Sequence, residues 1–141
     1  KIGLFDKNML YQHSNLLRKI NFSKTKPICV LFADKTFDLK IVEQLIYIGY
    51  KGIMIDTHDK NCKSITEILK YSEIKDFILM VKELNSICGL SGSLKLDDIN
   101  ILKNLNPDFL GFRGQLCSHT NDRSKIDIKL LNQVSNKINP Q

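Results

Sequence analysis

The sequence alternates five times between a short apolar run and a longer segment in which apolar residues recur every three or four positions. The short apolar runs predict buried strands, and the longer spacing predicts amphipathic helices between them. The predicted strands cover residues 2–5, 28–33, 53–56, 87–90 and 109–112. Apolar strands joined by helices are typical of a parallel sheet with helices packed on it. Right-handed crossovers then leave two α/β architectures open, a doubly wound sheet and a (β/α) barrel.

The predicted helices carry recognisable signals at their ends. Asp38 is predicted to cap the second helix, and Gly49 stands where a glycine commonly ends one. After the third strand, residues 61–71 are predicted as a polar connection, and Ser72 is predicted to cap the helix that follows. His13 falls on the apolar stripe of the first helix, where a histidine packed at the edge of the core is favoured over a ligand.

Three of the predicted strands end with small or polar residues and then a cation. The charged residues at these ends are Asp56 with Lys60, Lys95, and Arg113. Parallel α/β proteins build their chemistry at the carboxyl ends of strands. Asp56 with Lys60 and Lys95 suggests carbonyl chemistry, because a desolvated lysine near another cation loses its proton more readily and its neutral amine attacks carbonyls. A surface salt bridge is the alternative, and the spacing of Asp56 and Lys60 alone favours it.

Two glycine-containing turns predict a phosphorylated ligand. Gly92 and Ser93 follow the fourth strand and precede a helix, while Gly111, Arg113 and Gly114 follow the fifth strand. Backbone N–H groups and helix N-termini bind phosphate, and in barrels the loops after the last two strands commonly do so. The alternative interpretation is that these glycines only permit tight turns.

Composition and charge exclude several classes of function. No apolar run approaches the ~20 residues that span a membrane. The net charge of +6 suits an anionic partner, but the basic residues are scattered, so nucleic acid is not a predicted partner. No G-x-G-x-x-G follows the first strand, no Walker A sequence is present and no His or Cys cluster has zinc spacing, so no cofactor or metal is predicted. The four cysteines are far apart, which predicts reduced, cytosolic thiols that act as small apolar side chains.

Four motifs in the second half of the chain resemble a known enzyme family. They read Met54-Ile-Asp56-Thr57-His-Asp-Lys60, Leu90-Ser-Gly92-Ser93-Leu94-Lys95, Pro107-Asp108-Phe-Leu-Gly111-Phe-Arg113-Gly114-Gln-Leu-Cys117 and Asp122-Arg123. In order and spacing they resemble the C-terminal part of the (5-formylfuran-3-yl)methyl phosphate synthases, which are TIM-barrel enzymes that make the furan precursor of methanofuran. Residues 1–5 and 32–34 are similar to the family's fourth and fifth strands.

The resemblance implies that residues 1–141 form a single partial domain, the last five βα units (strands 4 to 8) of a (β/α)8 TIM barrel. It also implies a lyase that condenses two glyceraldehyde 3-phosphate molecules through a lysine Schiff base, with dehydration and loss of phosphate. In the family the Schiff-base lysine lies in a second-strand Asp-Val-Lys-Asn-Pro motif, which this sequence lacks. An incomplete barrel has two unpaired sheet edges, so we expect the chain to be stable only with its missing strands, a partner chain or a rearranged sheet.

The resemblance also supplies candidate site residues by position. Lys1 matches the proton-accepting lysine of the family's fourth strand, and Asp56 with Lys60 matches a carboxylate–lysine pair, so these three are the predicted catalytic residues. The predicted substrate- and phosphate-binding residues are Asp34, Gly92, Ser93, Lys95, Gly111, Arg113 and Gly114. A phosphorylated triose is the predicted partner, and self-association is left open.

Several positions depart from the family pattern. Leu31 and Cys62 stand where the family has glycine, and so do His119, Thr120 and Asn121. Phosphate loops depend on a close backbone approach that glycine permits. The departures therefore keep a second hypothesis open, a diverged or truncated barrel that binds a phosphorylated metabolite or a partner chain without catalysis.

Overall fold

The computed structural model of the chain describes residues 1–35, 37–59, 63–118 and 124–139. Its strands are β1 (Ile2–Gly3), β2 (Ile28–Phe32), β3 (Gly52–Asp56), β4 (Ile87–Leu90) and β5 (Phe109–Leu110). Its α-helices are α1 (Leu10–Lys19), α2 (Ile41–Tyr47), α3 (Ile65–Ile68), α4 (Tyr71–Glu83), α5 (Asp98–Lys103) and α6 (Ile128–Ile138), and its 3-10 helices are η1 (Lys7–Met9) and η2 (Gly114–Leu116). None of the helices in these ranges has the length and apolarity that crossing a membrane requires.

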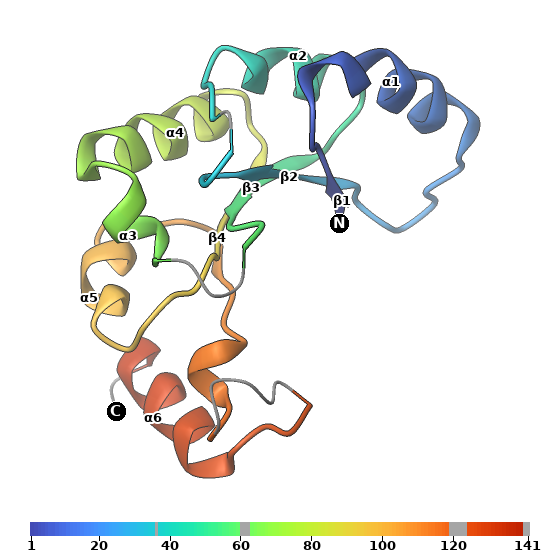
Figure 1. The fold of residues 1–141 in the computed structure, drawn as a ribbon. Coiled ribbons are helices and arrows are strands. Elements are labelled where there is room, and N and C mark those ends of the chain that lie inside the picture. The colour runs from blue at the N-terminus through green and yellow to red at the C-terminus, as the bar shows by residue number, and fades with distance from the viewer. Residues whose placement is uncertain (36, 60–62, 119–123, 140–141) are drawn as a thin grey trace.

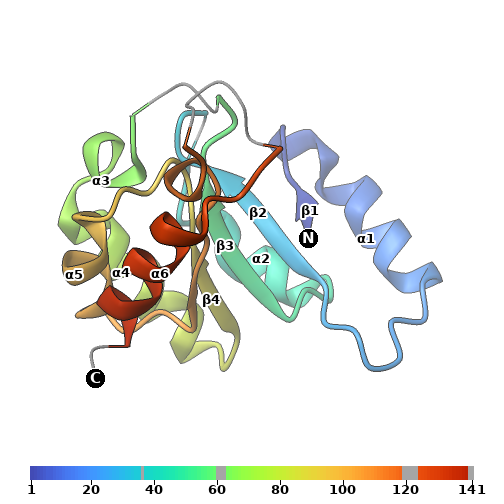
Figure 2. The same cartoon turned by 90° about the horizontal axis from the view of Figure 1, so that it is seen from below.

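The described strands form one parallel sheet in the order β1-β2-β3-β4-β5. This confirms the predicted α/β class and the parallel strands. Every strand lies beside the one that precedes it in the chain, whereas a doubly wound sheet reverses its strand order at one point. The described strands therefore do not form the doubly wound alternative. In Figure 1 the helices follow one face of the sheet as an arc, and Figure 2 shows β2, β3 and β4 side by side.

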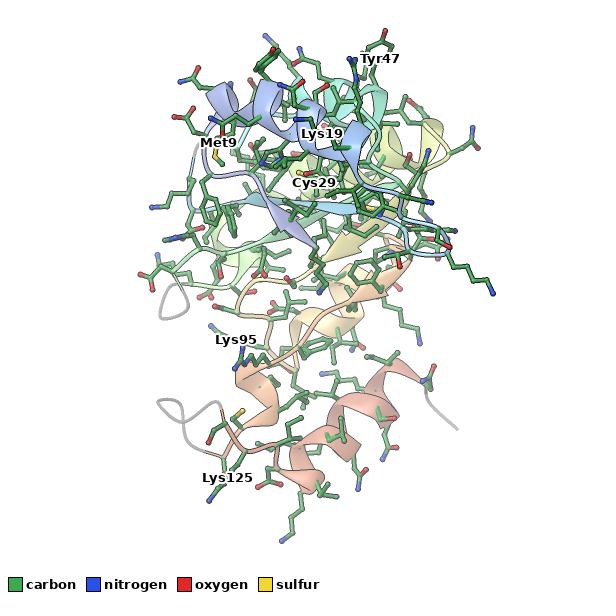
Figure 3. All side chains as sticks on the ribbon, turned by 90° about the vertical axis from the view of Figure 1, so that its right-hand side faces the viewer. Met9, Lys19, Cys29, Tyr47, Lys95 and Lys125 are labelled. Atoms are coloured by element: carbon green, nitrogen blue, oxygen red, sulfur yellow. The ribbon has the colours of Figure 1, made fainter. Side chains whose placement is uncertain are left out.

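The face of the sheet toward the helices holds the hydrophobic core. Side chains alternate between the two faces along a strand, so residues in register share a face. Cys29, Ile53 and Cys88 form one such row, and each is fully buried. Val42 of α2 and Phe77 of α4 are fully buried in the same core, where each contributes roughly 1.5–3 kcal/mol by leaving water. Figure 3 shows Cys29 between α1 and the sheet.

The opposite face of the sheet is the inside of a curve. Its central row, one residue from each strand, is Gly3, Val30, Met54, Gly89 and Phe109. The Phe109 ring covers Gly89, where a Cβ would lie 2.1 Å from it, and the Nζ of Lys1 lies 5.8 Å from the ring centroid. Lys1 precedes β1, and a flat sheet would hold β1 and β5 about 19 Å apart, four spacings of about 4.8 Å. The contact therefore shows that the sheet curls toward the face that the helices do not cover.

Several strand and helix boundaries differ from the predictions. β1 and β5 are the edge strands of the sheet, and each is two residues long, shorter than predicted. Helix α4 begins at Tyr71, where the N–H of Lys70 donates to the Glu73 carboxylate at 2.8 Å. Lys70 therefore stands at the cap position, and Ser72, the second residue of the helix, lies inside the first turn and does not cap it.

Helix α2 ends as predicted but begins differently. Asp38 accepts a hydrogen bond from the N–H of Lys40 at 3.0 Å, so it closes the turn before the helix and does not cap its first residues. Gly49 follows the helix with a φ of 121°. The N–H groups of Gly49 and Tyr50 donate to carbonyl oxygens of the last helical turn at 3.0 and 3.2 Å. This pair of bonds is the helix-ending motif that glycine favours, which confirms the role of Gly49.

The predicted polar connection after β3 contains a helix, α3. The N–H of Ser64, just before the helix, donates to the Glu67 carboxylate at 2.9 Å, and Ile65 is fully buried. The prediction was wrong because a helix of one turn is too short to show an apolar period. Residues 61 and 62 lie outside the described part of the chain.

His13 is packed at the edge of the core, as predicted. Its side chain is 4% exposed, and its Nδ1 lies 2.8 Å from the Tyr50 hydroxyl. Burial lowers the pKa of His13, because the charged imidazolium loses its hydration. Protonation of His13 is therefore less favourable in the folded chain than in the unfolded chain.

Replacing His13 with glutamine is expected to remove a pH dependence of stability. The folded pKa lies below the ordinary value of 6.5, so the unfolded chain takes up the proton first as the pH falls. The free energy of unfolding should be highest above pH of about 6.5 and should decrease below it, by at most about 1.4 kcal/mol per pH unit for one proton. Urea unfolding at a series of pH values measures this. An unchanged dependence in His13→Gln would contradict the assignment.

Candidate active site

A cavity of about 500 Å³ lies at the carboxyl ends of β3, β4 and β5. Its lining contains Lys1, Asp56, Gly92, Ser93, Gly111, Arg113 and Gly114, which are seven of the ten predicted site residues, and is completed by Ser91, Leu94 and Phe112. Four of the lining residues lie on the face of the sheet that the helices do not cover, because residues two positions apart along a strand point to the same side. Lys1 lies two positions before the row residue of β1, and Asp56, Ser91 and Gly111 lie two positions after those of β3, β4 and β5. The structure thus brings together most of the residues that sequence reasoning selected.

A larger hollow of about 690 Å³ lies on the outer surface at α1 and α2. Its lining is Leu10, Tyr11, Ser14, Glu43, Gln44, Ile46, Tyr47, Ile48 and Leu84. These residues include no cation and no glycine turn, and their one charged side chain is the carboxylate of Glu43, so they offer an anionic substrate no charge complementarity. Figure 3 shows Tyr47 pointing outward on this surface. The smaller cavity is therefore the better candidate for chemistry.

Asp56 is the last residue of β3 and brings a carboxylate to the cavity. Alternation along the strand puts it on the same face as Met54, while the fully buried Ile55 lies on the other. Its Oδ1 accepts a hydrogen bond from the N–H of Thr57 at 2.7 Å. The Thr57 hydroxyl lies 3.4 Å from the Ser93 hydroxyl, which connects the end of β3 to the turn after β4.

The turn after β4 requires glycine at position 92. Gly92 has a φ of 104°, and a Cβ there would lie 2.5 Å from Cγ2 of Ile65 and 2.9 Å from the backbone nitrogen of Thr57. Ser93 has a φ of 49°, a left-handed conformation that costs a residue with a Cβ about 1–2 kcal/mol. Backbone strain of this kind is concentrated at functional sites, so the turn is a candidate for ligand contact.

The segment after β5 brings a cation to the cavity. The N–H of Gly111 donates to the carbonyl oxygen of Leu90 at 2.8 Å, which continues the pairing of β4 and β5 beyond the end of β5. The carbonyl oxygen of Arg113 accepts from the N–H of Leu116 at 3.1 Å and from the Sγ of Cys117 at 3.3 Å. These bonds fix the backbone of Arg113, whose side chain is exposed and lines the cavity.

The charges in the lining favour a phosphate monoester. The cations are Lys1 and Arg113, and the carboxylate is Asp56, which gives a net charge of +1. A guanidinium presents a fork of N–H donors that matches phosphate oxygens, so Arg113 suits recognition of this group. The arrangement combines an anion-binding side with a carboxylate that can transfer protons.

Asp34 lies outside the lining and holds the loop after β3. Its carboxylate accepts hydrogen bonds from the N–H groups of His58 at 2.7 Å and Asp59 at 2.8 Å. Burial opposes ionisation of Asp34, but the hydrogen bonds from Asp59 and His58 outweigh it and lower the pKa of Asp34. In the structure Asp34 thus positions the neighbouring loop, and its predicted substrate binding stays a prediction.

Lys95 also lies outside the lining, on the exposed surface, and is labelled in Figure 3. Its Nζ donates to Oε2 of Glu67 at 2.8 Å. This hydrogen bond raises the pKa of Lys95 and lowers that of Glu67. A lysine that attacks a carbonyl needs a lowered pKa, and this ion pair acts in the opposite direction. The predicted roles of Lys95 in substrate binding and carbonyl chemistry stay predictions.

Lys60 lies outside the described residues, so its predicted catalytic role stays a prediction. The same holds for Cys62 and for residues 119–123, where the sequence departs from the family pattern. Within the described ranges, no group of three or more His, Cys, Asp and Glu side chains is placed to hold a metal ion.

Comparison with known proteins supplies the family. The family model described as 4-HFC-P synthase matches residues 1–135, which is nearly the whole chain. The chain belongs to the 4-HFC-P synthase family. The resemblance inferred from the four sequence motifs is thereby confirmed.

Relatives of the 4-HFC-P synthase family match over much of the chain. A (5-formylfuran-3-yl)methyl phosphate synthase of Methanosarcina mazei is 30% identical over 135 residues, covering 88% of this chain and 57% of that protein. The synthase of Methanosarcina acetivorans is 29% identical over 128 residues, covering 83% and 55%. A Methylorubrum extorquens protein that provisionally carries the same name is 36% identical over 100 residues, covering 71% and 42%. The chain spans about half the length of the curated relatives it matches.

Sequence reasoning missed part of this candidate site. It did not select the lining residues Ser91, Leu94 and Phe112. It also missed α3, although a Ser64-x-x-Glu67 pattern was present and has the form of a helix-starting capping box. That pattern was the available signal, and it lies in the segment that contacts the turn at Gly92.

Proposed function

We propose that the cavity is part of the active site of a (5-formylfuran-3-yl)methyl phosphate synthase, a lyase that condenses two molecules of glyceraldehyde 3-phosphate into a furan aldehyde phosphate for methanofuran biosynthesis. Family membership and the names of the relatives support this enzyme class. The observation that carries the proposal is the meeting of Lys1, Asp56 and Arg113 in one cavity, although they come from parts of the chain far apart in sequence.

We infer that the sheet is part of a (β/α)8 barrel, with the remaining strands supplied from outside these 141 residues. Three observations support this: the sequential strand order, the curl of the sheet toward the face without helices, and the length of the relatives. Closure of a barrel also pairs both edge strands, which removes exposed backbone donors and acceptors. In such a barrel the carboxyl ends of the strands form the rim that holds the active site.

The proposed role of the cation side is to hold two anionic substrates together. Phosphate groups on two trioses repel each other, and cations close to them offset that repulsion. Arg113 and the Gly92–Ser93 turn would receive one phosphate group. Fixing both trioses in one orientation turns a bimolecular reaction into an effectively unimolecular one, which supplies a large part of the rate increase.

The proposed role of Lys1 and Asp56 is proton transfer. An imine forms between the first triose and a lysine outside this chain, and the carbon next to it loses a proton before it attacks the second aldehyde. Later dehydration steps need a proton delivered to each leaving hydroxyl group, and phosphate leaves as the furan forms. A carboxylate and an amine beside the reacting atoms can accept and return these protons. Lys60 would assist Asp56, as the resemblance implies.

Replacing Arg113 with alanine, in the protein that contains this chain, is expected to raise the KM for glyceraldehyde 3-phosphate about 10–100-fold, the effect of one lost charge-assisted hydrogen-bonding partner. Release of inorganic phosphate and the absorbance of the furan aldehyde follow the reaction. Arg18→Ala is the matched control, since Arg18 is exposed on α1 and does not line the cavity, and its KM should stay within about threefold. Equal effects of the two substitutions would contradict the assigned phosphate site.

Borohydride trapping separates the enzyme from a binding protein. The wild-type protein should be labelled irreversibly in the presence of glyceraldehyde 3-phosphate, because borohydride reduces an imine to a stable amine. A wild-type protein that binds phosphate at the cavity but is never labelled and forms no product would replace this proposal with the non-catalytic alternative.

A further inference from the structure

The segment that contains α3 contacts both ends of the turn after β4. We call Ser64–Glu67, together with Asp98 at the start of α5, the α3 brace. At the first end of the turn, the N–H of Ile65 donates to the carbonyl oxygen of Gly92 at 3.1 Å. At the other end, the N–H of Lys95 donates to Oδ2 of Asp98 at 2.7 Å. The cavity-lining residues Gly92, Ser93 and Leu94 lie at or between these two attachment points.

The Asp98 carboxylate is the centre of the α3 brace. It is buried, with 8% of the residue exposed, and it accepts three hydrogen bonds. The donors are the Ser64 hydroxyl at 2.8 Å, the Thr66 hydroxyl at 2.5 Å and the N–H of Lys95 at 2.7 Å. A buried carboxylate is costly unless donors surround it, so these bonds hold the two segments in one arrangement.

A second carboxylate reinforces the same connection. Oε2 of Glu67 accepts from the N–H of Ser64 at 2.9 Å and from the ammonium of Lys95 at 2.8 Å. Lys95 is thus held twice, by its backbone at Asp98 and by its side chain at Glu67. Lys95 follows the glycine turn in the sequence, and these two attachments give it a structural role there that does not depend on contact with the ligand.

We propose that Asp98 is a positioning residue for phosphate recognition, which acts through the α3 brace by fixing the backbone of the Gly92–Ser93 turn. This inference rests on the proposed function, because it takes the turn as the receiver of the substrate's phosphate group. Asp98 itself is not in the cavity lining. Its effect comes from the strained conformation of the turn, which has left-handed φ values at both Gly92 and Ser93 and needs external support.

The test is titration of inorganic phosphate into the protein that contains this chain, followed by the NMR shifts of the Gly92 and Ser93 amide groups. Asp98→Asn keeps the shape of the side chain but removes its negative charge, so the hydrogen bonds from Ser64, Thr66 and Lys95 lose the extra strength that an ionised acceptor gives them. We expect the dissociation constant for phosphate to rise about tenfold. Asp97→Asn is the matched control, since it makes the same charge change one residue earlier on a fully exposed side chain, and it should change binding less than about twofold.

Two further variants separate positioning from general loss of stability. Val42→Ala destabilises the core far from the turn, and it should leave phosphate affinity unchanged while urea unfolding shifts. Ser64→Ala removes one donor to Asp98 and should weaken phosphate binding about threefold, which keeps the inference open to test if Asp98→Asn does not fold. In the assay of the enzyme, Asp98→Asn should raise the KM more than it lowers kcat, as expected when a binding contact is loosened.

The outcomes distinguish this inference from the proposed function. Weaker phosphate binding in Asp98→Asn and Ser64→Ala, with wild-type affinity in Asp97→Asn and Val42→Ala, supports it. Equal phosphate affinity in the wild type, Asp98→Asn and Ser64→Ala would overturn it and leave the proposed function in place. Absence of phosphate-dependent shifts at Gly92 and Ser93 in the wild type would overturn the phosphate assignment itself, and this inference with it.

Discussion

Replacing Asp56 with asparagine is expected to lower kcat by a factor of about 10²–10⁴, the usual contribution of a general acid or base. In the wild type the N–H of Thr57 donates to Oδ1 of Asp56 at 2.7 Å. Asparagine has the same size and keeps an oxygen that can accept this hydrogen bond, so the end of β3 should keep its conformation. What it loses is the ability to take up and return a proton. Steady-state kinetics with glyceraldehyde 3-phosphate measures the change.

The control for this prediction is Asp76→Asn, an equal charge change on the exposed surface of α4. It should leave both kcat and KM at their wild-type values, because exposed charges far from a site are screened. A kcat for Asp56→Asn within about threefold of the wild type would show that Asp56 lines the cavity without transferring a proton. A rise in KM alone would instead make it a binding residue.

Replacing Gly92 with alanine is expected to lower the free energy of unfolding by about 2–5 kcal/mol, from the left-handed backbone and from overpacking together. The added Cβ would meet Cγ2 of Ile65 at 2.5 Å and the backbone nitrogen of Thr57 at 2.9 Å. Neither atom is the end of a long flexible side chain, so the turn must move. Phosphate affinity should fall with stability, since the displaced turn belongs to the cavity. Urea unfolding and phosphate titration measure the two effects.

Gly49→Ala is the matched control, because Gly49 also has a positive φ, of 121°, but its neighbours leave room for a Cβ, with the closest at 3.9 Å. It should show the backbone cost alone, about 1–2 kcal/mol, and no loss of phosphate affinity. Equal losses of stability in the two variants would mean that the contacts around Gly92 relax, and that the turn is less constrained than the distances indicate.

The sequence predicted the sheet well because strand and helix periods differ clearly in this chain. Apolar runs such as residues 28–33 and 87–90 correspond to β2 and β4, and the parallel arrangement follows from the helices between them. The lengths of β1 and β5 were not predictable, since they depend on which neighbours an edge strand has. Helix α3 was missed because a single turn carries no period, and only the Ser64–Glu67 spacing indicated it.

The candidate site was partly predictable for a geometric reason. Parallel strands end at one edge of the sheet, so Asp56, Gly92 and Arg113 could be expected to converge before any coordinates were known. The partners of Lys95 and Asp34 could not be expected. Lys95 binds Glu67, which is 28 positions away, and Asp34 binds an N–H group 24 positions away. Such pairs depend on the packing of separate segments, which a single sequence does not reveal.

Strand β3 serves two purposes at once, because odd and even positions along it face opposite sides of the sheet. Ile53 and Ile55 belong to the core, whereas Met54 and Asp56 lie on the opposite face, where Asp56 lines the cavity. Inserting or deleting one residue within β3 would exchange these sets, turning a carboxylate toward the helices and an isoleucine toward the ligand. A change of length within the strand would therefore disturb both faces at once, whereas a substitution disturbs only one. We expect natural variation in chain length to be confined to the connections between strands.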